Sequence, residues 1–317
     1  MTRPELLGYS GILVILGMGW AITLPLTKIA VSTGHGAFGL IFWQLVIGAI
    51  LLGALTLVRG RGLPLTRGTL GFFTFIALIG TVIPNASSYK AVVHLPAGVI
   101  SILMSLIPMI AFPMALGLRL ERFNARRFFG LLAGLVGVSL LVVPKASLPD
   151  AAMLAWIPVA LIGPVFYAFE GNFVAKWGTA GLDAIQMLFG ASVVGALMTL
   201  PLALWSGQFV NPIRPWGAPE WALVISSAIH ALVYTGYVWL VGRTGSVFAM
   251  QVSYLVTGFG VFWAMVLLKE TYSPYIWAAL GLMMIGVFLV QPRARAALAR
   301  QDKASQGVTR PNRRIKR

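Results

Sequence analysis

Cysteine is absent from this 317-residue chain, and acidic residues are scarce, with eight Asp and Glu against 24 Lys and Arg. Without cysteine the chain forms no disulfide framework, no thiolate zinc or iron–sulfur site and no cysteine nucleophile. Only 10% of its residues are charged, compared with roughly 25% in soluble proteins. Because 58% of the residues are apolar and the mean hydropathy is +0.87, the composition excludes a soluble globular protein and indicates a lipid bilayer as solvent.

Motifs of common catalytic chemistry are also missing. The sequence has no HExxH, Walker A or dinucleotide-binding glycine pattern and only three His, so we expect no enzyme activity, no metal site and no cofactor. One short match, Gly8-Tyr9-Ser10-Gly11, resembles the nucleophile motif of rhomboid-type intramembrane proteases, with His230 as a nominal base. Because Ser10 lies at the membrane edge of the first long apolar run and the chain has too many runs for that fold, an intramembrane hydrolase is kept only as an alternative hypothesis.

Long apolar runs fill most of the chain. A helix needs about 20 mostly apolar residues to cross the hydrocarbon core, and the runs lack the alternation of membrane β-strands. They predict an all-α polytopic membrane protein with ten transmembrane helices at 9–30, 38–58, 70–90, 97–118, 128–144, 152–176, 184–206, 220–241, 246–268 and 274–291.

The basic residues are distributed unevenly between the two ends of these helices. With the N-terminus in the cytoplasm, 19 Lys and Arg fall on the cytoplasmic side and five on the other, which predicts cytoplasmic N- and C-termini. The tail 293–317 holds nine of them and is predicted to be a disordered end against anionic lipid. We expect no nucleic-acid partner for the core, although the tail leaves a nucleic-acid or regulatory partner open.

The two halves of the sequence resemble each other. Glu121 with Gly130 and Gly137 matches Glu270 with Ala279 and Gly286 at an offset of 149 residues, and Trp20 matches Tyr167 at 147. Because each half holds five spans, an odd number, the second half must insert upside down relative to the first. The predicted organisation is two inverted five-helix repeats, 1–146 and 147–292, with a binding site near the membrane midplane between them.

Specific residues carry a family resemblance. The segment Ala91 to Gly98, Pro108, and Glu121 with its following glycines resemble the EamA-type pattern of the drug/metabolite transporter superfamily, and 270–286 resembles its second copy. Trp20 with Lys28 is also similar to that family. The resemblance implies a ten-helix carrier of small metabolites, most often an exporter in the bacterial inner membrane. Family members often carry Arg near the position of Gln44, so the substrate charge does not follow from the resemblance.

Polar and aromatic residues within the predicted spans are the candidate substrate contacts, because burying polar groups in hydrocarbon is costly without a function or a partner. Glu170 is the one carboxylate well inside a span. It is either a substrate-amine or proton-coupling group, or a residue at the cytoplasmic end of the sixth span that reaches the interface or pairs with Lys176. Lys28 either reaches out to the interface or faces the cavity. The full set of candidate substrate contacts is Trp20, Gln44, Asn85, Tyr89, Tyr167, Glu170, Gln186, Tyr234, Tyr237, Gln251 and Tyr254.

The predicted function is therefore that of a secondary transporter working by alternating access. Amino acids or related amphipathic compounds are the expected substrates, with export the expected direction, although import of a small metabolite stays open. The expected partners are a small-molecule substrate and the lipid bilayer, with the protein acting as a monomer or dimer.

Overall fold

The protein is described by a computed structural model that covers residues 3–142, 148–244 and 246–290. This described part contains helices and no strand. The tail 293–317, for which disorder was predicted, lies outside the described residues. The elements are α1 (Arg3–Ala30), α2 (Ala37–Val58), α3 (Arg67–Ala77), η1 (Leu78–Val82), α4 (Ile83–His94), α5 (Ala97–Met104), α6 (Ile107–Gly117), α7 (Ala125–Val142), η2 (Ala151–Trp156), α8 (Ile157–Trp177), α9 (Ala184–Trp205), α10 (Ala218–Thr244), α11 (Ser246–Ala249), α12 (Val252–Leu268) and α13 (Pro274–Val290).

Eight helical segments within the described residues are long and apolar enough to cross a membrane. The segment 67–94 joins α3, η1 and α4, and the segment 97–117 joins α5 and α6. The helices α12 and α13, of 17 residues each, are shorter and also apolar. Large apolar side chains are exposed on the outer surface of the helices. Examples are Phe129 and Leu135 on α7 and Phe288 on α13. Such broad apolar exposure fits lipid better than water.

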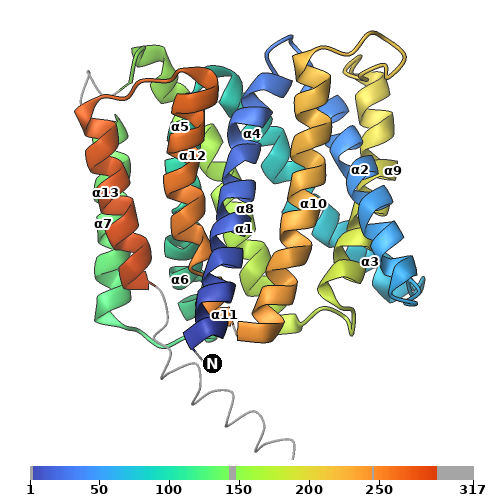
Figure 1. Ribbon diagram of the computed structural model, residues 1–317, viewed down its shortest axis with the longest axis horizontal. Helices are drawn as coiled ribbons and strands as arrows, with labels where there is room; N and C mark the ends of the chain where they lie inside the picture. The colour runs from blue at the N-terminus through green and yellow to red at the C-terminus, as the bar shows by residue number, and fades with distance from the viewer. Residues whose placement is uncertain (1–2, 143–147, 245, 291–317) are drawn as a thin grey trace, which may run out of the picture.

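The helices run up and down through one block (Figure 1). The pair α7 and α13 lies at one edge and the pair α2 and α9 lies at the other, with α3 beside α9. Between these edges, α1 packs against α10 and α12, while α8 packs against α4 and α6. The first helix thus finds its main partners late in the chain, and α8 finds its partners early in the chain.

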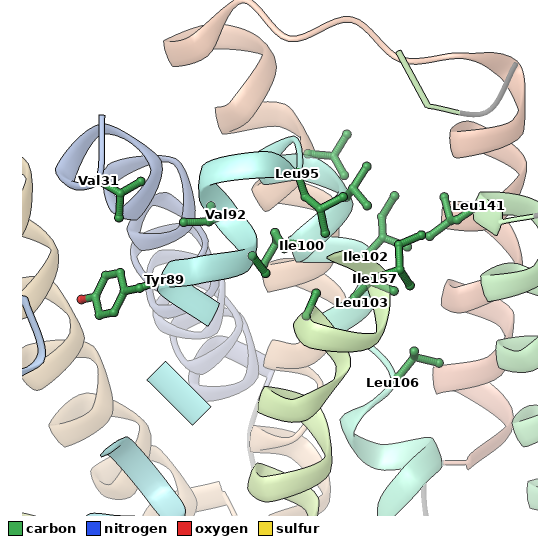
Figure 2. Packing of buried hydrophobic residues seen from close by; sticks show 14 of the residues in the cluster. Val31, Tyr89, Val92, Leu95, Ile100, Ile102, Leu103, Leu106, Leu141 and Ile157 are labelled. Atoms are coloured by element: carbon green, nitrogen blue, oxygen red, sulfur yellow. The ribbon is translucent and has the colours of Figure 1, made fainter. Parts of the chain in front are cut away.

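Prolines break the long helical segments. Leu95 is extended because the residue before a proline disfavours the helical conformation, so α4 ends there and α5 begins after Pro96. Pro108 occupies the first turn of α6, where a missing N–H is tolerated. The apolar core gathers around the α4–α5 break, with Leu95, Ile102 and Leu103 fully buried (Figure 2).

Glycines allow the closest helix contacts. The two edge helices α7 and α13 meet at Gly130 and Gly286, where a Cβ on either glycine would lie 2.8 or 2.9 Å from the carbonyl oxygen of the other. At the opposite edge, Gly53 of α2 faces the ring of Phe189 and Gly195 of α9 faces Leu45. Small residues at these positions bring the backbones together, which is how membrane helices gain packing energy without a hydrophobic driving force between them.

Candidate functional site

A stretch of π-helix forms one wall of the candidate site. Pro84 has no N–H to pair with the carbonyl group of Gly80, one turn earlier, so the regular helical ladder fails there. The chain widens into η1, in which the N–H of Ile83 donates to the carbonyl oxygen of Leu78. Single π-turns inside α-helices are frequent at functional sites.

The carboxylate of Glu170, on α8, lies against this π-helix. A Cβ on Gly80 would come within 2.6 Å of the Glu170 Oε1 atom, so only glycine leaves room for the carboxylate. Glu170 is half-buried and makes no hydrogen bond or ion pair with any described residue. Lys176, its alternative partner, is exposed and places its Nζ atom 5.0 Å from the centroid of the Trp177 ring. The described contacts thus give Glu170 no partner from the chain itself.

A hydrogen-bonded network joins three helices beside Glu170. Asn85 and Tyr89 of α4 both donate to the Oε1 atom of Gln44 on α2, at 3.0 and 2.9 Å. The hydroxyl of Tyr167 on α8 donates to the Oδ1 atom of Asn85 at 2.9 Å. In Figure 2 the Tyr89 ring points away from the apolar core residues Val92 and Leu95. The network holds α2, α4 and α8 together through side chains that the sequence had marked as candidates.

Gln44 is the shared acceptor of this network, so replacing it should be costly. In a Gln44→Leu variant the donors of Asn85 and Tyr89 lose their acceptor, and we expect the free energy of unfolding to fall by about 2 kcal/mol. Gln44→Glu, which retains accepting oxygens at the same position, is the control and should lose less. Thermal unfolding in detergent measures both, and equal midpoints for the Leu variant and the wild type would contradict the assigned role.

Aromatic rings from α1 and α10 make the opposite wall. The Trp20 ring meets His230, Tyr234 and Tyr237 edge-on, with ring centroids 5.8, 6.2 and 5.7 Å apart. These three residues recur on one face of α10 at spacings of four and three. The arrangement presents ring faces and edges that suit apolar or cationic groups.

A cavity of about 60 Å³ adjoins both walls, although Trp20, Glu170 and Tyr237 are not among its lining residues. Gln44, His230 and Tyr234 line it, together with Thr81 of the π-helix and two serines, Ser192 of α9 and Ser227 of α10; Leu45, Gly48, Leu52, Leu188 and Ala231 complete the lining. His230 lies at the middle of α10, where it is exposed and lines this space. Thr81, Ser192 and Ser227 were missed from sequence, although Ser227 sits one turn before His230.

The remaining candidates lie apart from this cavity. The Gln186 side chain closes a capping box at the start of α9, accepting from the N–H of Asp183 and donating to the carbonyl oxygen of Gly62. Burial acts to raise the pKa of Asp183, but the N–H groups of the capping box and the guanidinium groups of Arg59 and Arg61 outweigh it and hold the pKa below its usual value. Gln186, predicted as a candidate substrate contact, thus helps to order a helix start instead.

The candidates on the ninth predicted span are also separate. Gln251 is exposed at the residue before α12, and Tyr254 packs against the main apolar core. The Tyr254 hydroxyl is buried without a hydrogen-bond partner among the described residues. Neither residue lines the central cavity.

Hydrolase chemistry receives no support from the geometry. Ser10 lies on α1 ten residues before Trp20, which corresponds to about 15 Å along a helix axis. Because Trp20 is the residue of α1 that meets His230, Ser10 and His230 are too far apart for a nucleophile and its base. Among the described residues, no group of three or more His, Asp and Glu is placed to hold a metal ion.

Known proteins with similar sequences or folds agree with this architecture. The model of the EamA-like transporter family matches residues 8–143 and again 154–291. A "Probable terminal-alkyne amino-acid exporter" from Streptantibioticus cattleyicolor is 25% identical over 300 residues, covering 92% of this chain and 95% of that protein. A solved structure described only as "Crystal structure of protein" shares the fold with a TM-score of 0.60 at 18% identity, covering 92% of this chain and 99% of the other.

The apolar helices are those of a multi-pass membrane protein, and the match to the family model makes it a transporter. Since the family model matches twice and covers most of the sequence, the chain belongs to the EamA-like transporter family, within the drug/metabolite transporter type.

Proposed function

We propose that this protein is a secondary transporter that exports a small amine-bearing metabolite, an amino acid or related amphipathic compound, across the bacterial inner membrane. The observation that carries the proposal is the carboxylate of Glu170, which lies inside a membrane helix and has no hydrogen-bond partner among the described residues. The ammonium group of a substrate would give this carboxylate a positively charged partner. Intramembrane carboxylates characteristically mark substrate or proton sites.

The rest of the site suits the other parts of such a substrate. The rings of Trp20, Tyr234 and Tyr237 offer an apolar surface, and His230 and Gln44 offer hydrogen bonds. The cavity of about 60 Å³ has room for only a few water molecules, so an amino acid enters only when the surrounding helices part. The relative from Streptantibioticus cattleyicolor is named as a probable amino-acid exporter, which supports this substrate class and the outward direction.

Alternating access between two inverted repeats is the proposed mechanism. The contacts of the first half have counterparts in the second: α1 packs on α10 as α8 packs on α4, and α1 packs on α12 as α8 packs on α6. These pairs relate to each other as expected if 1–146 and 147–292 are five-span repeats of opposite orientation, with α12 and α13 as the ninth and tenth spans. Both termini would then lie in the cytoplasm, as the distribution of basic residues predicts.

Flux through reconstituted protein tests the proposed function. Proteoliposomes loaded with single amino acids, with amines lacking a carboxylate and with carboxylates lacking an amine should release the amine-bearing solutes well above protein-free vesicles. Solutes without an amine should leave at the background rate, because Glu170 cannot pair with them. Absence of protein-dependent flux for every amine in the panel would sink the proposal, and flux of carboxylates alone would contradict the role of Glu170.

A further inference from the structure

The break between α4 and α5 is held from two sides by residues of other helices. At such a break, the last carbonyl groups of one helix and the first N–H groups of the next lose their partners within the helix. The Nζ atom of Lys28 donates to the carbonyl oxygens of Val92 and Leu95, both at 2.7 Å, and so satisfies the end of α4. A cation at a helix C-terminus is also favoured by the helix dipole.

Glu270, in the loop after α12, satisfies the start of α5. Its two carboxylate oxygens accept from the N–H groups of Ala97 at 2.8 Å and Gly98 at 3.1 Å. The hydroxyl of Tyr272 donates to the Oε2 atom of Glu270 at 2.6 Å. Burial, together with this bond to Glu270, raises the pKa of the Tyr272 phenol, so the hydroxyl keeps its proton as a donor.

Lys28 and Glu270 act from one group of packed helices. Lys28 is in the last turn of α1, Glu270 follows α12, and these two helices pack against each other. Together they hold the α4–α5 break, of which α4 packs mainly against α8 and α5 packs mainly against α12. Lys28 and Glu270 also line a pocket of about 340 Å³, together with His94 and Lys269 among others. This pocket shares no lining residue with the central cavity.

The repeat provides a counterpart of Lys28 at the other end of the molecule. Lys176 follows Lys28 by 148 residues, within one residue of the offsets that relate Trp20 to Tyr167 and Glu121 to Glu270. Lys176 lies in the last turn of α8 as Lys28 lies in the last turn of α1. The helix that corresponds to α4 in the second half is α10.

The two lysines differ in what they contact. Lys28 is half-buried on backbone carbonyl groups, whereas Lys176 is exposed and lies over the ring of Trp177. The helices differ in the same sense: α1 packs against α4, while α8 and α10 are not among the closely packed helix pairs of the described chain. At one end of the molecule, Lys28 therefore links α1 to α4 by hydrogen bonds to backbone carbonyl groups. At the other end, Lys176 contacts the ring of Trp177 instead.

We propose that Lys28 and Lys176 are paired gate residues that bind the C-terminal carbonyl groups of α4 and α10 in alternation. In the state described here, Lys28 closes the end at the α4–α5 break. In the opposite state Lys28 releases α4, and Lys176 leaves Trp177 to bind the end of α10. This assignment rests on the alternating access of the proposed function, and with the N-terminus in the cytoplasm the closed end is the outer one.

Opposite effects of two charge-removing substitutions test the gate. Because the chain has no cysteine, Ser227→Cys places a single thiol in the central cavity, and a membrane-impermeant thiol reagent applied to one face of oriented vesicles reports which end is open. Lys28→Met in this background should raise the labelling rate from the α4–α5 face about tenfold, since charge-assisted hydrogen bonds that hold this end closed are lost. Lys176→Met should lower the rate from that face, and Lys28→Arg should restore it toward the parent value.

A structural role alone would lower thermal stability without shifting labelling between the faces. The proposal would therefore be overturned if the labelling rate from the α4–α5 face changed in the same direction in Lys28→Met and Lys176→Met. An unchanged labelling rate in Lys28→Met would also overturn it. If Lys28→Met fails to fold, Lys176→Met still decides, because its exposed side chain is not needed for packing and only the gate predicts slower labelling from the α4–α5 face. If the two variants shift the labelling rate in opposite directions but the protein shows no amine flux, the gate is upheld and the proposed substrate is rejected. If amine flux is present without these shifts, the gate alone is rejected.

Discussion

Replacing Glu170 with Gln is expected to reduce amine flux in proteoliposomes by about two orders of magnitude, which corresponds to the loss of roughly 3 kcal/mol from a buried charge pair. The amide has nearly the same shape as the carboxylate and fits beside Gly80, so the cavity and the fold should be retained. What is lost is the negative charge that pairs with the substrate ammonium group. Initial rates at several substrate concentrations will show whether the loss falls on binding or on turnover.

Glu220→Gln is the matched control, since Glu220 accepts from His35 and from the N–H of Gly217 near the start of α10, away from the cavity. Flux should be retained in this variant. Equal flux in Glu170→Gln and the wild type would remove Glu170 from the substrate site. A pH gradient gives a second readout: if Glu170 also carries the coupling proton, the residual flux of Glu170→Gln will not respond to the gradient, and an unchanged response rejects that role.

Replacing Gly286 with Val is expected to lower the free energy of unfolding by about 3 kcal/mol, at the upper end of the usual cost of overpacking. A Cβ at this position would lie 2.5 Å from the Met109 Cε atom and 2.9 Å from the carbonyl oxygen of Gly130. The methionine can move aside, but the backbone carbonyl of α7 cannot move without displacing the helix. The edge pair α7–α13 must then separate.

Gly281→Val provides the control on the same helix, because a Cβ on Gly281 has no neighbouring atom within 4 Å. We expect its stability to stay within about 0.5 kcal/mol of the wild type. Thermal unfolding followed by size-exclusion chromatography in detergent compares the two variants. Similar midpoints for Gly286→Val and Gly281→Val would show that the close approach of Gly130 and Gly286 does not limit stability.

Much of the helical framework was predictable because it follows from apolar run length. The predicted run 38–58 corresponds to α2, 184–206 to α9 and 274–291 to α13, each within one residue at either end. The interruptions inside the runs were harder to predict. Pro84 indicated a disturbance in the third run, but whether a helix kinks, breaks or widens into a π-turn depends on the neighbours that cover the freed carbonyl group.

The site was predictable where residue type was enough and unpredictable where geometry mattered. Gln44, Asn85, Tyr89 and Tyr167 are polar in a hydrocarbon environment, and they prove to bond to one another. Gln186 is equally polar, but a glutamine three residues after an Asp at a helix start can satisfy the backbone there instead. Sequence spacing does not distinguish a glutamine in a hydrogen-bonded network from one in a capping box, because the capping box depends on where the helix begins.

Helix α1 packs mainly against helices of the second half and α8 packs mainly against helices of the first half, which has a consequence for synthesis and membrane insertion. Helix α1 ends at Ala30, yet its neighbours α10 and α12 begin at Ala218 and Val252, so most of the chain is synthesised before α1 is covered. Until then Trp20, whose ring partners are all on α10, must be tolerated by lipid or by the insertion machinery. Neither half can complete its packing alone, so the two halves expressed as separate chains should be degraded singly and accumulate when produced together.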